Sequence, residues 1–153
     1  MTDVGGIVVY VKDCNGLVHF LLGYETSISK WSGFVGGYEE SDGTIEYTAI
    51  REFNEETAKI FENDIPFVKD KIKDSLLITG NTGNRIVYLW FIQFPYNIIN
   101  EDIEQRFLDN LSIMTDKCYK EKSKLKWFSI NEICKNDILY KLKKVILDNY
   151  SKF

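Results

Sequence analysis

Residues 36–60 read GGYEESDGTIEYTAIREFNEETAKI. A glycine pair opens this stretch and an acidic turn follows. The second half contains the four charged residues Arg51, Glu52, Glu55 and Glu56. Three glutamates so close together concentrate more negative charge than an ordinary surface helix carries. The other segments of the chain are interpreted as support for this stretch.

A helix is predicted from Thr44, whose hydroxyl makes it a suitable N-cap, to about Ile60. At about 100° per residue, Glu52, Glu55 and Glu56 fall on one face that is about 100° wide. Like charges at these spacings weaken an isolated helix by ~0.3 kcal/mol per pair. They also lie in the C-terminal half, where the helix dipole disfavours negative charge.

A bound divalent cation would remove this electrostatic conflict. Clustered carboxylate oxygens suit hard ions such as Mg²⁺ or Mn²⁺. Gly36 and Gly37 add to the pattern, because a backbone without a Cβ can approach a ligand or a metal closely. A solvated acidic surface is the alternative interpretation of the glutamates taken alone.

The segments around this stretch predict a mixed β-sheet with helices on its faces, in one domain of residues 1–153. Strands are expected at 5–12, 17–23, 75–79, 85–94 and 125–130, with 85–94 as the central strand because its apolar run is unbroken. Turns are expected at 13–16 and 80–84. Helices are expected at 101–111 and from 137 onward. Residues 25–32 and 61–74 are interpreted as a polar loop and a charged connection.

Composition limits the class of protein. The chain has 153 residues and 44% hydrophobic residues, which is typical of a globular domain. Cys14, Cys118 and Cys134 fit neither a disulfide framework nor a zinc site, which favours a reducing cytoplasmic location. The sequence has no long apolar run, so no membrane association is expected.

The stretch at 36–60 resembles the Nudix box. In that motif a glycine is followed by five residues, a glutamate, seven residues, Arg-Glu, an apolar residue, any residue, Glu-Glu, any residue, a glycine and an apolar residue. Gly37 takes the first place, and residues 51–56 match the core in identity and spacing. Ala58 stands in place of the box glycine and Lys59 in place of the final apolar residue. The resemblance implies a Nudix-like α/β/α sandwich with a mixed sheet.

The glutamate of the box is also replaced, because Gly43 occupies its place. In the family this glutamate often pairs with the box arginine. Arg51 therefore needs another partner, for which Asp42 and Glu40 are the candidates. On this basis we expect Gly43→Glu to be tolerated.

The resemblance implies a Mg²⁺-dependent (or Mn²⁺-dependent) pyrophosphohydrolase. It implies that Glu52, Glu55 and Glu56 bind the metal, that the Gly37 carbonyl adds a ligand, and that Arg51 orients the carboxylates. Metal ions neutralise phosphate oxygens and acidify a bound water, which promotes attack on a polyanionic substrate.

The base that activates the attacking water is open at this point. Any of the three box glutamates is a candidate. In relatives a glutamate from a later loop sometimes takes this role, for which Glu101 and Glu104 are candidates. His19, the only histidine of the chain, lies in a predicted strand and is interpreted as structural.

The substrate is expected to be a small molecule with a phosphoanhydride bond. The family covers nucleotide sugars, dinucleoside polyphosphates, diphosphoinositol phosphates, oxidised nucleotides and mRNA caps. Lys30 and Arg85 are candidates for phosphate binding, and Trp31 and Tyr38 are candidates for stacking on a base.

Other classes of partner and function stay open. The lysines at 117, 120, 122, 124 and 126, with those at 141, 143 and 144, could contact an RNA backbone. The alternating lysines at 120–126 are equally typical of the solvent face of an edge strand. A non-catalytic Nudix-fold module that binds nucleotide or RNA is the alternative function. The expected oligomeric state is a monomer or a homodimer.

Overall fold

The computed structural model describes residues 2–153. The strands are β1 Val4–Lys12, β2 Val18–Glu25, β3 Lys30–Ser32, β4 Phe34–Gly37, β5 Leu76–Thr82, β6 Arg85–Gln93 and β7 Lys122–Ser129. The α-helices are α1 Ile45–Glu56, α2 Ile65–Lys71, α3 Ile103–Ile113, α4 Ile130–Lys135 and α5 Tyr140–Asp148. Short 3-10 turns include Glu40–Asp42, before α1, and Lys117–Lys120, before β7.

Within these residues the strands form one mixed sheet. Its main path runs β3-β2-β1-β6-β5, while β4 pairs with β1 and β7 pairs with β2. β1 and β6 are parallel, and the other neighbouring pairs are antiparallel. The expectation of a mixed sheet is confirmed, but its centre is β1 and not residues 85–94. Of the described strands, only β5 lies beyond β6 in the sheet, so β6 is next to the edge strand. Ile86, near the start of β6, is exposed.

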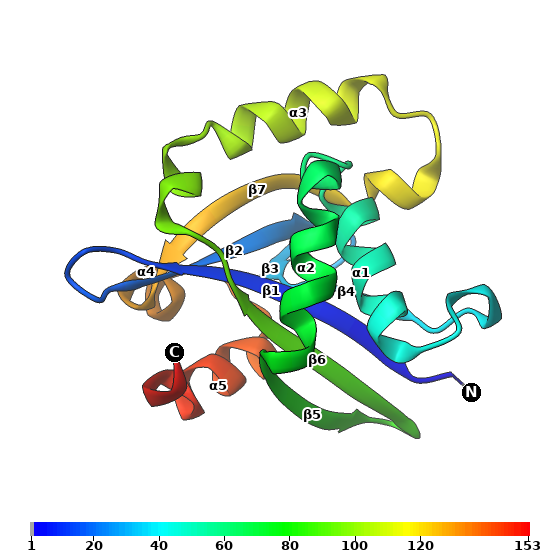
Figure 1. The fold of residues 1–153 in the computed structure, drawn as a ribbon, viewed down its shortest axis with the longest axis horizontal. Helices are drawn as coiled ribbons and strands as arrows, with labels where there is room; N and C mark the ends of the chain where they lie inside the picture. Colours follow the sequence, from blue (N-terminus) through cyan, green and yellow to red (C-terminus); the bar gives the residue numbers. More distant parts are fainter. Residues whose placement is uncertain (1) are drawn as a thin grey trace.

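Helices cover both faces of this sheet (Figure 1). Ile7 and Val9 of β1 pack with residues of α1, α2 and α3 in one apolar cluster. Val8 and Tyr10, which point the other way, pack with residues of α4 and α5 in a second cluster. The alternation along β1 therefore supplies two cores, as a strand buried on both faces requires.

The sheet divides along one edge of β1. β4 pairs with the first half of β1, where Gly5 lies opposite Gly36, and β2 pairs with the second half, where Val9 lies opposite Leu21. β3 pairs with the far end of β2. The link from β3 to β4 at Gly33 therefore lies where two partner strands of β1 diverge.

Several predicted boundaries are wrong by a few residues. The box helix ends at Glu56 and not near Ile60, because the backbone then turns into a left-handed conformation at residues 58 and 59. The turn predicted at 80–84 is confined to Gly83 and Asn84, since Gly80, Asn81 and Thr82 continue the pairing of β5 with β6. The hairpin at 13–16 is confirmed.

Four elements were not predicted, namely β3, β4, α2 and α4. β3 and β4 are three and four residues long, so they are too short to show an alternating pattern. The charged segment that contains α2 buries Val68 but exposes most of its other residues. Such short elements depend on the sheet for their stability.

Two findings bear on the class of protein. None of the helices in residues 2–153 has the length and apolar character that crossing a membrane requires. Cys14, Cys118 and Cys134 are all exposed and free of disulfides.

Candidate metal centre

Gly5 of β1 and Gly36 of β4 allow helix α1 to lie directly on the sheet. A Cβ at Gly5 would stand 2.8 Å from the Ile45 carbonyl oxygen, and a Cβ at Gly36 would overlap the carboxylate of Glu52. These two glycines are opposite each other on β1 and β4. The missing side chain of Gly5 makes room for the backbone of α1, and that of Gly36 makes the space in which the Glu52 carboxylate is held. As predicted, the Thr44 hydroxyl caps α1.

Arg51 binds several parts of the centre at once. Its Nε and Nη2 donate to the two oxygens of Asp42 at 2.7 and 3.0 Å. Nη1 donates to Glu52 at 2.9 Å and lies 3.5 Å from Glu55, and Nη2 also donates to the Gly37 carbonyl at 3.0 Å. The predicted choice between Asp42 and Glu40 as partner of Arg51 is settled in favour of Asp42.

Asp42 is held in its charged form. The guanidinium of Arg51 lowers the pKa of Asp42 to about 2, and the Glu39 N–H and the Thr48 hydroxyl also donate to its carboxylate. The same pair raises the pKa of Arg51. A charge-assisted bidentate pair of this kind fixes direction as well as distance. Asp42 therefore takes over the bracing role that the family gives to the glutamate one place later.

Gly43 follows Asp42 in a backbone conformation that side chains disfavour. Its φ is 77° and its ψ is −43°. The turn can thereby send Asp42 back towards Arg51 and begin α1 two residues later. This conformation argues against the expectation that Gly43→Glu is tolerated, although no heavy atom lies within 4 Å of the site of a Cβ.

A three-carboxylate cluster forms beside α1. Oxygen atoms of Glu52, Glu56 and Glu121 lie within 4.8 Å of one another. Glu121 is the residue immediately before β7, and it was not identified from the sequence. The two candidates proposed instead lie elsewhere: Glu101 pairs with Arg106, and Glu104 is exposed on the first turn of α3.

The cluster has the properties of a site for a hard cation. Burial raises the pKa of Glu52, of Glu55 and, most strongly, of Glu56. One buried oxygen of Glu56 has no hydrogen-bond partner among the described residues. Carboxylate oxygens that converge in this way are the ligands that Mg²⁺ and Mn²⁺ prefer. The residues present therefore fit a divalent cation.

The two other predicted metal ligands are placed differently. Glu55 lies to the side of the cluster, with Oε2 3.5 Å from Arg51. The Gly37 carbonyl already accepts a hydrogen bond from Arg51, which leaves one lone pair. Glu52 and Glu56 thus form the cluster together with Glu121. Glu55 and the Gly37 carbonyl lie outside the cluster, and both contact Arg51.

A buried lysine lies next to the cluster. Lys122 is 1% exposed, and its Nζ donates to the Ser32 hydroxyl at 2.5 Å and to Glu25 at 3.2 Å. Its positive charge opposes the effect of burial on the pKa of Glu56. The β2–β7 pairing shifts register between Tyr24 and Glu25, and Lys122 is the residue opposite Glu25. The regular alternation of inward and outward side chains along β7 is therefore interrupted next to Lys122.

The lysine tract is therefore not one solvent face. Lys122 is buried, whereas Lys124 is exposed and lies over the rings of Tyr24 and Trp31. β7 is an edge strand paired with β2, as one of the two interpretations required. Contact with RNA stays a prediction.

The four predicted substrate-binding residues fall into two separate pairs. Lys30 forms an ion pair with Asp137 at 2.6 Å, and next to it Trp31 packs edge-on against Phe128. Arg85 borders Gly37, with Nη2 donating to Thr2 at 3.2 Å. Tyr38, the next residue after Gly37, lines a hollow of about 430 Å³ to which Thr2 also contributes.

An apolar pocket lies on the α5 side of the sheet. It has a volume of about 290 Å³, and its walls include Val35, Leu89 and Leu142. Glu25 and Ser32, the two partners of Lys122, also line it. The pocket and the carboxylate cluster therefore share the Lys122 network as a neighbour.

Comparisons with known proteins identify the family of the chain. A family model described as the NUDIX domain matches residues 4–150. Because this match covers nearly the whole chain, the protein belongs to the NUDIX family. The expectation of a Nudix-type pyrophosphohydrolase is thereby confirmed at the level of the family. No curated protein matches the sequence.

Solved structures of the same fold are distant in sequence. An Ap4A hydrolase from C. elegans, solved as a binary complex, has a TM-score of 0.60 and 16% identity, with 100% of both chains covered. The NUDIX domain of NrtR from Shewanella oneidensis, complexed with ADP ribose, has a TM-score of 0.61 and 10% identity, covering 99% of this chain and 88% of that one. A NUDIX-family hydrolase from Clostridium perfringens has a TM-score of 0.58 and 15% identity, covering 96% and 94%.

We predict that Gly43→Glu and Gly43→Ala destabilise the protein by similar amounts, ~1–3 kcal/mol each. The cost comes from the positive φ of residue 43 and not from crowding, so a larger side chain adds little. Urea unfolding followed by circular dichroism measures both variants. A stable Gly43→Glu protein would show that the turn can form without glycine.

A second prediction concerns acid stability. Because the pKa of Asp42 is about 2 in the folded protein and 3.8 is its ordinary value, its ionised form stabilises the fold above about pH 4. This contribution, ~1–2 kcal/mol, is lost as the pH falls through about 2. The difference in unfolding free energy between the wild type and Asp42→Asn should therefore shrink between pH 5 and pH 2. A difference that is independent of pH would contradict this account of Asp42.

Proposed function

We propose that the protein is a Mg²⁺-dependent hydrolase that cleaves a pyrophosphate bond in a nucleoside diphosphate linked to another group. The observation that carries this proposal is the cluster of Glu52, Glu56 and Glu121, with its unpaired buried oxygen. Mn²⁺ is the alternative metal, since the same oxygen ligands serve both ions.

The charged residues have two kinds of role in the proposed reaction, namely holding the cation and orienting a carboxylate. Glu52, Glu56 and Glu121 hold the cation, and Glu55 lies beside them. Arg51 fixes the direction of the Glu52 carboxylate through its 2.9 Å hydrogen bond. When bound, the cation neutralises phosphate oxygens and acidifies the attacking water.

Among these carboxylates we assign the proton acceptor for the attacking water to Glu121. It is the exposed member of the cluster, whereas Glu56 is buried and Glu52 is tied to Arg51. An exposed carboxylate can bind a water molecule and pass its proton to solvent. Glu121 replaces Glu101 and Glu104, which lie away from the cluster.

We assign the binding of the nucleoside part of the substrate to the apolar pocket between β6 and α5. Pockets for nucleosides are mostly apolar with a few polar groups, and here Glu25 and Ser32 supply such groups among Val35, Leu89 and Leu142. Two similar structures are named for such molecules, one as an Ap4A hydrolase and one as a complex with ADP ribose, and both molecules join a nucleoside to another group through phosphates. This chemistry supports a nucleotide substrate.

A panel of substrates with Mg²⁺ or Mn²⁺ tests the proposed activity. It contains nucleotide sugars, dinucleoside polyphosphates, capped RNA and diphosphoinositol phosphates. We expect metal-dependent hydrolysis of at least one member and none in excess EDTA. Tight binding of a nucleotide without hydrolysis of any member would favour the alternative, a non-catalytic binding module.

We predict that Glu55→Gln and Glu56→Gln each reduce metal-dependent hydrolysis more than tenfold, which is about 1.4 kcal/mol in the activation barrier. The amide keeps the shape of the side chain and removes a negative charge, which at Glu56 is that of a proposed ligand and at Glu55 is that of a carboxylate beside the proposed cation and Arg51. Glu46→Gln is the matched control, since Glu46 is exposed on the first turn of the same helix. Unchanged turnover in both variants would refute the proposed site.

A further inference from the structure

The segment after α1 has an unusual backbone. Ala58 and Lys59 both lie in the left-handed region, with φ of 51° and 59°. Ala58 N–H donates to the Glu55 carbonyl at 3.0 Å, and Lys59 N–H donates to the Asn54 carbonyl at 2.9 Å. This pair of bonds is the Schellman motif, in which the first left-handed residue is usually glycine. Here that residue is alanine, whose Cβ crowds the backbone in this conformation.

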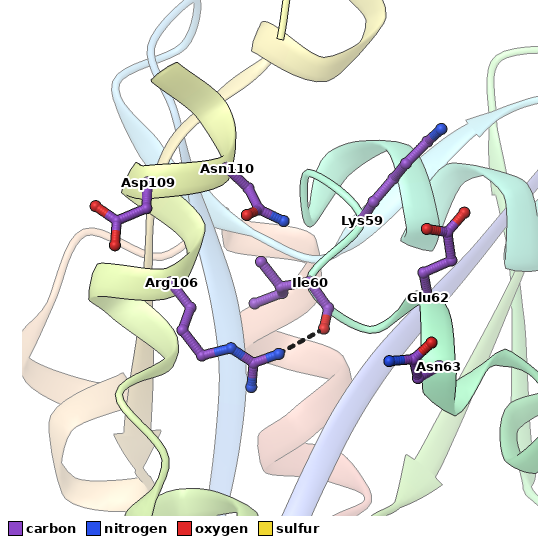
Figure 2. Close-up of a pocket in the computed structure, with 7 residues that line it drawn as sticks. All are labelled: Lys59, Ile60, Glu62, Asn63, Arg106, Asp109 and Asn110. Atoms are coloured by element: carbon purple, nitrogen blue, oxygen red, sulfur yellow. Dashed lines mark hydrogen bonds between the residues drawn. The ribbon is translucent and has the colours of Figure 1, made fainter. Parts of the chain in front are cut away.

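Two side chains of α3 hold this segment from outside. Asn110 Nδ2 donates to the Ala58 carbonyl at 3.0 Å, and Arg106 Nη2 donates to the Ile60 carbonyl at 2.9 Å. Figure 2 shows both side chains on α3 directed at this segment, with the bond from Arg106 to Ile60 drawn as a dashed line. We refer to these two bonds as the α3 clamp.

The clamp acts close to the carboxylates. The Schellman bonds join Ala58 and Lys59 to the last turn of α1, and Glu56 is the last residue of that helix. Ala58 and Ile60 are buried in the same core cluster as Phe107, which lies on α3 between the two clamp residues. A shift of this segment would therefore move the end of α1 together with Glu56.

We propose that Asn110 and Arg106 are positioning residues for the carboxylate cluster. They hold the Ala58 turn in a conformation that glycine adopts unaided, and so they fix the last turn of α1. This inference rests on the proposed metal-binding role of Glu56. It assigns α3 a part in the centre although no residue of α3 belongs to the cluster.

The test is a double-mutant cycle of Asn110→Ala and Ala58→Gly, with Mn²⁺ as the probe. Asn110→Ala should weaken Mn²⁺ binding about fivefold, measured by titration calorimetry, because Ala58 can then leave the left-handed region. Ala58→Gly in the same chain should restore most of the affinity, since glycine keeps that conformation without the clamp. Gln105→Ala is the matched control, because the Gln105 side chain is exposed on α3 and, among the described residues, donates only to Asp109.

Two results would overturn the inference. One is Mn²⁺ binding by Asn110→Ala that equals that of Gln105→Ala, and the other is a loss that Ala58→Gly does not restore. Arg106→Met, which keeps the stem and removes the guanidinium, provides a second variant if Asn110→Ala does not fold.

The same cycle separates this inference from the proposed function. If the wild type neither binds Mn²⁺ nor hydrolyses any substrate, the proposed function fails. The clamp itself is then judged by urea unfolding: Asn110→Ala should cost more stability with alanine at position 58 than with glycine. Equal costs in the two backgrounds would mean that the clamp does not hold the turn.

Discussion

The candidate centre depends on one guanidinium. Arg51 joins the turn at Asp42, the helix at Glu52 and the strand at Gly37. Without it, three carboxylates on one short helix would repel one another next to a buried apolar core. The planar fork of arginine can serve several acceptors in fixed directions, which the single ammonium of a lysine cannot do. The close approach of α1 to the glycines of β1 and β4 then sets where this network lies on the sheet.

The departures from the Nudix box follow a common logic. Where the box glutamate is replaced, the acid is supplied one residue earlier by Asp42, and Gly43 provides the turn that brings it back. Where the box glycine is replaced, Ala58 keeps the left-handed conformation and α3 supplies bonds to the segment. In both places a neighbouring part of the chain provides the support that the replaced residue does not.

The sequence predicted the box helix, its cap and the residues that face the site, because their spacing along one helix is sufficient to place them. Asp42 was one of two candidates because it lies close in sequence to the box position that Gly43 occupies. Glu121 and Lys122 could not be found in this way, because they reach the site through the pairing of β7 with β2, which joins residues about 100 positions apart. The Lys122 side chain turns inward at a register shift, and no local pattern indicates such a shift.

Lys122 affects the charge balance of the carboxylate cluster before any metal binds. Its buried ammonium is bound to Ser32 and Glu25 and lies near the acidic cluster, so a positive charge is built into the fold. In a zinc finger the metal supplies the free energy of folding, and the empty chain is unfolded. Here the resident charge balances part of the acid before any ion arrives. The fold therefore does not rely on the proposed cation alone to balance the negative charge of the cluster.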